Sequence, residues 1–346
     1  MKKKLFLPLF LRAAARFLLL WVLMVFLLSL RELDAQITRL ENGVSESRDW
    51  NLRNCQLVLE GGSEPWDRPA ILNDRMYTYY ATYGAVGVFR LHDAEGQELA
   101  RSQLTYGSFS LNTGVYDHYL NFDAVLTDDE QLALGRLLRE ERQLNCFYGT
   151  EGLYGEYAGS DGGESFTVGL RGEVTGVVEH NVVYPQKLVY YYEDGPVTLL
   201  DIDSPFFDGK TLTTLTFDAA QLSSPLVWAD TSPALTLELF REAEARLEQL
   251  LGARAPNGDW AGSSNSRSGY ASVGASSAYD GLTSACGVSY RPALMATHGL
   301  MLLYGFTLLF TMLLAYLTAR AQAKSLRRER ALTNAVAHEL KTPLAL

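Results

Sequence analysis

The chain has 346 residues, of which 47% are apolar, and a formal net charge of −10. This length accommodates two domains with their connections, and the acidic balance argues against direct nucleic-acid binding, which favours basic chains. Apolar residues are concentrated in two runs, 13–30 and 294–319. The roughly 260 residues between these runs have the composition of a water-soluble domain.

Basic residues gather at both ends of the chain. The end pieces hold 11 of the 30 basic and 2 of the 40 acidic residues, which leaves 19 basic and 38 acidic residues, a net charge of −19, for the remainder. The basic residues of the ends are Lys2, Lys3, Lys4, Arg12, Arg16, Arg320, Lys324, Arg327, Arg328, Arg330 and Lys341. Because cytoplasmic flanks of membrane helices are rich in Lys and Arg, both termini are predicted to be cytoplasmic and the acidic middle extracellular.

The first apolar run has two interpretations. Its uninterrupted part, Phe17–Leu30, is 14 residues long and follows a basic start, as in a secretory signal peptide. We favour an uncleaved membrane helix, because Arg12 and Arg16 can extend to the interface and Leu33-Asp34-Ala35 is a poor cleavage site. In both interpretations the middle of the chain is exported.

Organisation along the chain follows from these features. The helix of the first span is expected to continue outside the membrane and to break near Asn42-Gly43. The predicted segments are a basic tail at 1–12, a transmembrane helix at 13–35, an extracellular sensor domain at 36–293, a second transmembrane helix at 294–319 and a cytoplasmic segment at 320–346.

The extracellular segment is predicted to mix strands and helices. Alternating apolar residues with intervening turn residues indicate strands within 86–104, 187–203 and 209–218. Helices are indicated after Thr127, which stands three residues before Glu130 as in a capping box, and after the N-cap Ser232. We therefore predict an α+β domain.

Two parts of this domain have further interpretations. The hairpin at 86–104 resembles the central strands of extracellular PAS-like (Cache) sensor domains. The stretch 256–291 is rich in Gly, Ser and Tyr and nearly lacks periodicity, so we expect a mobile loop or linker. Cys55, Cys146 and Cys286 all lie in the exported part, where one disulfide would leave one thiol, and all three pairings stay open.

The second apolar run is predicted to continue into the cytoplasm as one helix. Neither proline nor glycine occurs between Arg320 and Thr342. On a helical wheel Leu332, Val336 and Leu340 form one stripe that suits a partner helix, and His338 lies opposite, one turn from Thr342.

The residues "HELKTPL", 338–344, resemble the H-box of the sensor histidine kinases of bacterial two-component systems, and the preceding "ALTNAVA" resembles the start of their dimerisation domain. The resemblance implies that His338 is the phosphoacceptor. It also implies that Glu339 contacts the imidazole or takes its proton, and that Thr342 orients water for dephosphorylation of the response regulator. Pro343 would bend the helix beyond the histidine.

Further expectations follow from this resemblance. The chain would be a homodimer in the cell membrane that passes a phosphoryl group to a cytoplasmic response regulator. ATP and Mg²⁺ would be bound by a catalytic domain for which no motif occurs in the sequence, so the chain is expected to be a fragment, inactive alone. The alternatives are a non-enzymatic receptor with two spans, in which the H-box is a vestige, and an adhesin or envelope structural protein.

The stimulus is left open by the sequence. The charge of −19 is consistent with a cationic extracellular ligand, and equally with an acidic surface that provides solubility. His92, His118 and His180 each adjoin an acidic residue, which could give a pH sensor or metal site, but no two have ligand spacing, so we favour structural roles. The many tyrosines fit a strand surface or a groove for sugar or peptide.

Overall fold

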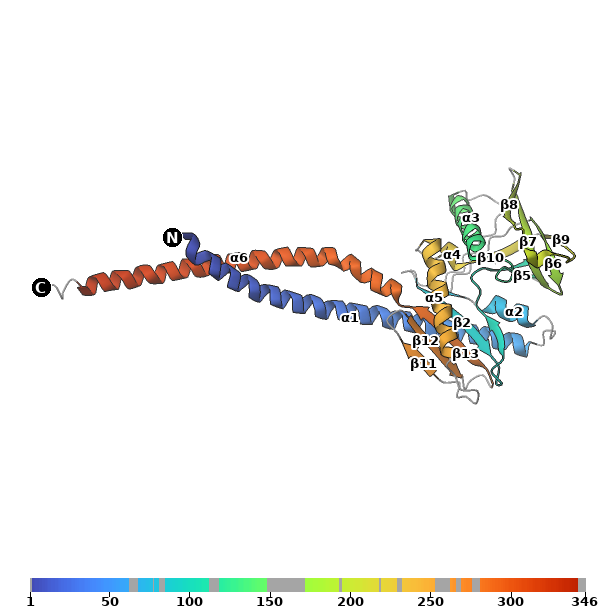
Figure 1. Cartoon of the computed structure of the whole chain (residues 1–346), viewed down its shortest axis with the longest axis horizontal. Coiled ribbons are helices and arrows are strands. Elements are labelled where there is room, and N and C mark those ends of the chain that lie inside the picture. The colour runs from blue at the N-terminus through green and yellow to red at the C-terminus, as the bar shows by residue number, and fades with distance from the viewer. Residues whose placement is uncertain are drawn as a thin grey trace. The chain divides into compact units, whose positions relative to one another are not determined.

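The computed structural model describes residues 2–61, 68–76, 78–80, 85–111, 118–147, 172–192, 195–217, 219–228, 232–252, 262–265, 269–275 and 281–341. The chain divides into two compact units, one of residues 1–36 with 294–346 and the other of residues 37–293. Most of their helices and strands are labelled in Figure 1.

Two described helices are long and apolar enough to cross a membrane. They are α1, Lys2–Glu60, and α6, Arg291–Lys341. Their apolar stretches are almost uncovered by protein: Leu19 is 70% and Phe306 is 72% exposed. The core helix of a soluble protein would bury such side chains, so this exposure is consistent with contact to lipid.

The first unit is a pair of helical segments joined by polar contacts. Trp21 Nε1 donates to Thr307 Oγ1 at 2.9 Å, and Ser29 Oγ donates to the Tyr304 hydroxyl at 3.0 Å. Small side chains let two helices approach closely. Those buried on α6 are Ala315, Ala319 and Ala323.

The predicted break of the first helix near Asn42-Gly43 is wrong, because α1 continues to Glu60. Its apolar stripe extends past the glycine through Val44 and Leu52, which are buried. A helical glycine costs about 1 kcal/mol, whereas each buried leucine or valine contributes roughly 1.5–3 kcal/mol, so the helix persists. A Cβ at Gly43 would lie 2.3 Å from the Tyr79 hydroxyl oxygen, so close packing explains the glycine.

The second unit contains two open sheets in its described part. The first, sheet A, has the order β1-β2-β13-β12-β11, with β3 paired to β2, and every pair is antiparallel. Its strands are β1 Tyr79–Tyr80, β2 Val86–His92, β3 Glu98–Arg101, β11 Gly262–Asn265, β12 Gly269–Ala275 and β13 Thr283–Ser289.

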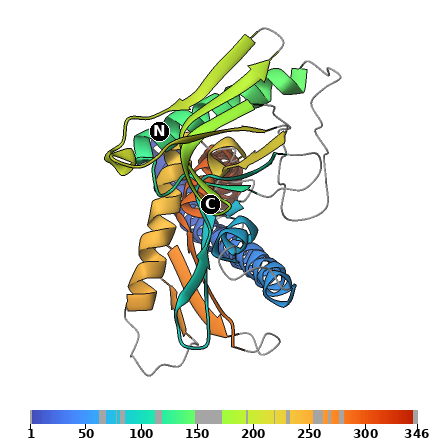
Figure 2. The same cartoon turned by 90° about the vertical axis from the view of Figure 1, so that its right-hand side faces the viewer.

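Helices cover both faces of sheet A. The helix α5, Pro233–Gly252, packs on the face of Arg90 and Gly287, and the outer part of α1 packs on the face of Gly87 and Cys286 (Figure 2). Every residue of β2 and β13 is therefore buried. The helix after Ser232 was predicted correctly, and the Ser232 hydroxyl accepts from the Leu235 N–H at 3.4 Å.

The expectation of a mobile loop at 256–291 is wrong for the described residues, which form β11, β12 and β13. Some of the small residues that suggested a linker are required by the packing. A Cβ at Gly287 would lie 2.5 Å from the carbonyl oxygen of Ala243 in α5. A strand buried on both faces also lacks the alternation by which strands are recognised.

The second sheet, sheet B, has the order β10-β4-β5-β7-β6-β9, with β8 paired to β7. Only the β5–β7 pair is parallel among the described pairs of this sheet. Its strands are β4 Tyr106–Ser110, β5 His118–Asn121, β6 Gly172–Glu179, β7 Val182–Tyr192, β8 Gly195–Asp201, β9 Thr213–Phe217 and β10 Ala219–Ser223. The strands predicted at 86–104, 187–203 and 209–218 are thus confirmed.

Short helices complete the second unit. They are α2 Arg68–Arg75, α3 Asp128–Phe147, the 3₁₀ turn η1 Pro205–Phe207 and α4 Pro225–Trp228. The predicted capping box of α3 is confirmed, because the Thr127 N–H donates to Glu130 Oε2 at 2.7 Å and the Glu130 N–H donates to Thr127 Oγ1 at 3.4 Å. Leu134 and Leu138 of α3 join the core of sheet B.

Candidate functional site

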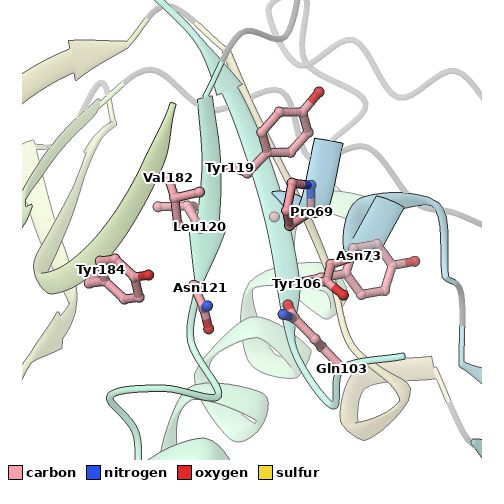
Figure 3. A pocket seen from close by; sticks show the side chains of 10 residues that line it. Pro69, Asn73, Gln103, Tyr106, Tyr119, Leu120, Asn121, Val182 and Tyr184 are labelled. Carbon is pink, nitrogen blue, oxygen red and sulfur yellow. The ribbon is translucent and has the colours of Figure 1, made fainter. Parts of the chain in front are cut away.

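A small open cavity of about 120 Å³ lies between α2 and sheet B (Figure 3). Three kinds of side chain line it, namely tyrosines, carboxamides and apolar groups. The lining residues are Pro69, Asn73, Gln103, Tyr106, Gly107, Tyr119, Leu120, Asn121, Val182 and Tyr184. None of these residues is charged, although the chain between its two apolar runs carries a large acidic excess.

The carboxamides of this cavity are oriented by the backbone. Asn73 Oδ1 accepts from the Arg101 N–H at 2.9 Å, and Asn121 Oδ1 accepts from the Ala124 N–H at 3.2 Å. Each oxygen is thereby engaged, and the NH₂ group is what each side chain offers to a ligand. Gln103 also lines the cavity and is 7% exposed.

Tyrosines contribute the aromatic part of the lining. Tyr106 is buried in β4, whereas Tyr119 and Tyr184 are half-buried in β5 and β7. The Tyr184 ring contacts Phe206, with 5.2 Å between ring centroids. Burial, aided by the nearby Glu179, raises the pKa of Tyr184, so its hydroxyl stays neutral and can donate a hydrogen bond.

A hydrogen-bonded carboxylate, that of Asp123, lies where the chain passes from sheet A to sheet B. Asp123 Oδ1 accepts from Gln131 Nε2 at 2.7 Å, and its Oδ2 accepts from the Leu104 N–H at 3.3 Å. Ser224 Oγ donates to the Leu104 carbonyl at 2.9 Å and accepts from Thr105 Oγ1 at 3.2 Å. Burial raises the pKa of Asp123, whereas the Gln131 bond lowers it. The network ties both sheets to α3.

The residues predicted for phosphotransfer lie at the end of α6. His338 and Glu339 fall within this helix, but their side chains, like all of Thr342, lie outside the described residues. The helix continues unbroken to Lys341, as predicted. Leu332 is 66% and Val336 is 50% exposed, so these two residues of the predicted apolar stripe are uncovered in a single chain.

The structure describes the side chains of two of the three cysteines. Cys55 and Cys286 are free and buried, and burial raises the pKa of Cys55 to about 12 and that of Cys286 to about 11. Neither is a reactive thiolate at neutral pH. The side chain of Cys146 lies outside the described residues.

The three histidines do not form one site. His92 lies in sheet A, whereas His118 lies in β5 of sheet B and His180 in the turn before β7. The described residues contain no group of three or more His, Cys, Asp or Glu that could hold a metal ion. The acidic residue Asp128 instead pairs with Arg241 of α5, so part of the acidic excess has a structural role.

No sequence motif marks the cavity, because its lining comes from four separate stretches, 69–73, 103–107, 119–121 and 182–184. Only the abundance of tyrosine suggested a groove for sugar or peptide. Comparison of the chain with family models, curated proteins and solved structures found no match. The resemblances of the hairpin and of the H-box therefore stay predictions.

Proposed function

We propose that the chain is the sensing and phosphoacceptor part of a transmembrane histidine kinase. The extracellular unit of residues 37–293 would bind a stimulus, and α6 would transmit it to His338 in the cytoplasm. The continuous helix α6 carries this proposal, because it begins directly after β13, contains the second candidate span and ends in the H-box sequence. Between the second candidate span and His338 there is no room for a relay of roughly fifty residues such as a HAMP domain.

Contacts at the start of α6 support a path for the signal. The Tyr290 hydroxyl donates to Glu41 of α1, and Arg291 pairs with Glu242 of α5 at 3.0 Å and with Glu238. A ligand that shifts sheet A against these helices would therefore move the first turn of α6. The proposed output is a piston, rotation or scissor motion of the span.

The cytoplasmic part of α6 supports a dimer. The exposed Leu332 and Val336 stand four residues apart, and a second copy of the helix would cover them. In this dimer His338 would be the phosphoacceptor and Glu339 would contact its imidazole. Thr342 would take part in dephosphorylation of the response regulator.

ATP and Mg²⁺ are not assigned to residues of this chain. The described part offers no cluster of metal-ligating side chains, and the sequence contains no phosphate-binding glycine motif. The nucleotide would belong to a catalytic domain outside residues 1–346. This chain would supply the imidazole that accepts the phosphoryl group and the helix that forms the dimer around it.

The test joins residues 1–346 to the second dimerisation helix and catalytic domain of a characterised histidine kinase. Membranes carrying this fusion are incubated with γ-labelled ATP, and acid-labile label is compared among wild type, His338→Gln and the control Arg327→Gln, which changes an exposed residue of the same helix. We expect label in wild type and control and none in His338→Gln.

Two further variants separate the proposed roles. Glu339→Gln should slow labelling, whereas Thr342→Ala should leave labelling intact and slow only the dephosphorylation of the regulator. Equal label in His338→Gln and wild type, or no label in a dimeric and folded fusion, would contradict the kinase proposal. A receptor with two spans and without enzymatic activity would then be the better interpretation.

A further inference from the structure

We infer that the cavity between α2 and sheet B is a binding site for a single neutral sugar ring. The inference deepens the proposed function, on which its role as a stimulus rests, but the binding itself depends on the cavity alone. It also departs from the cationic ligand that the acidic charge of the domain suggested.

The lining excludes charged ligands. A charged group loses hydration when it enters a site, and this loss must be offset by an opposite charge or by several strong hydrogen bonds. The ten lining residues include no Asp, Glu, Lys, Arg or His. Amino acids, dicarboxylates, phosphates and polyamines therefore lack the partner that each would require.

The lining also disfavours a purely apolar ligand. The NH₂ groups of Asn73 and Asn121 remain after their oxygens are engaged by the backbone, and a hydrocarbon would bury these donors without acceptors. A ligand with several acceptor oxygens satisfies them. Sugar hydroxyls can accept hydrogen bonds from these NH₂ groups and donate to the side-chain carbonyl oxygen of Gln103.

The tyrosines and the volume narrow the class further. Sugar rings have a face of C–H groups, which suits the rings of Tyr119 and Tyr184 and the apolar side chain of Val182. Sites for drug-sized ligands usually measure ~300–1,000 Å³, whereas this cavity measures about 120 Å³. One ring is therefore the size that fits, with its outer hydroxyls in solvent.

The test uses ligands that share one ring and differ in charge. The full chain in lipid nanodiscs is titrated by saturation-transfer NMR with D-glucose, D-galactose and D-mannose, and with the amino sugar and the uronate that have the same ring configuration as each. We expect saturable binding of at least one neutral hexose and at least tenfold weaker binding of its two charged counterparts.

A matched pair of substitutions locates the site. Asn121→Asp keeps the oxygen that accepts from the Ala124 N–H but replaces the NH₂ donor by a negative oxygen. This variant should weaken hexose binding roughly tenfold and favour the amino sugar. Asn265→Asp, at an exposed position of β11, introduces the same charge far from the lining and should leave all affinities unchanged.

Several results would overturn the inference. These are charged analogues that bind as tightly as the neutral hexose, saturable binding that Asn121→Asp leaves unchanged, and no binding of any of the three hexoses. Tyr184→Phe provides a second variant should Asn121→Asp fail to fold, and loss of the hydroxyl should weaken hexose binding several-fold. This experiment measures binding and no phosphoryl transfer. Absence of hexose binding would therefore not contradict the kinase proposal, and absence of phosphorylation in the kinase test would not contradict the sugar site.

Discussion

Replacing Gly287 by alanine should destabilise the unit of residues 37–293 through a steric clash in sheet A. The added Cβ would lie 2.5 Å from the Ala243 carbonyl oxygen and 3.2 Å from Leu247 Cβ. An ordinary contact begins near 3.4 Å, so α5 and β13 must separate by roughly 0.9 Å along this direction. The obstacle is helix backbone, which cannot adopt another rotamer.

The expected cost is about 1–3 kcal/mol, the range for overpacking in a close-packed core. For a unit of this size the melting temperature should fall by roughly 2–4 °C per kcal/mol, measured by near-UV circular dichroism on the full chain in detergent. Gly274→Ala is the matched control, because it lies in the adjacent strand β12 and its Cβ would meet only Arg48 Nη1 at 3.7 Å. Equal melting temperatures for the two variants would refute the close packing of β13 against α5.

Three further predictions concern other parts of the chain. Desolvation of the carboxylate raises the pKa of Asp123, so the folded state retains a proton that the unfolded state loses. The stability that this group contributes therefore falls as the pH rises from its ordinary pKa through the raised one. Asp123→Asn should remove that decline, and parallel profiles of melting temperature against pH for variant and wild type would contradict this prediction. Glu130→Ala should lower the free energy of unfolding by about 1 kcal/mol, because it removes the carboxylate that accepts from the Thr127 N–H. Thermal unfolding would detect this loss, and the control Glu140→Ala, at an exposed position of the same helix, should not show it. Ala319→Leu should separate the two spans, since Ala319 is fully buried on α6, and cysteine cross-linking between positions 21 and 307 should then become less efficient than in an otherwise unchanged chain.

Local signals in the sequence predicted part of the fold. The helix that begins after Thr127 and the hairpin at 86–104 were found because capping and turn residues act within a few positions. The central strand β13 was missed because its small residues are dictated by α5, which is distant in sequence. The continuation of α1 beyond Gly43 was missed for the same reason, since packing on sheet A stabilises it.

The two candidate sites, the H-box and the cavity, also differ in how far they could be predicted from the sequence. An H-box is a contiguous motif, so His338 could be proposed from seven residues, and its role stays a prediction. The cavity depends on side chains such as Asn73 and Asn121 that are brought together only by the fold. Their useful property, an oxygen occupied by backbone and an NH₂ left for a ligand, is visible only in three dimensions.

The central position of β13 has a consequence for biosynthesis. This strand pairs with β2 although the two lie about 190 residues apart in sequence, and it directly precedes α6. Until the ribosome has made β13, the edge of β2 that will receive it is an open template for other chains. Completion of sheet A and emergence of the second candidate span therefore follow each other closely during translation. A chain interrupted shortly before Thr283 should be prone to aggregation and should need a chaperone to stay soluble.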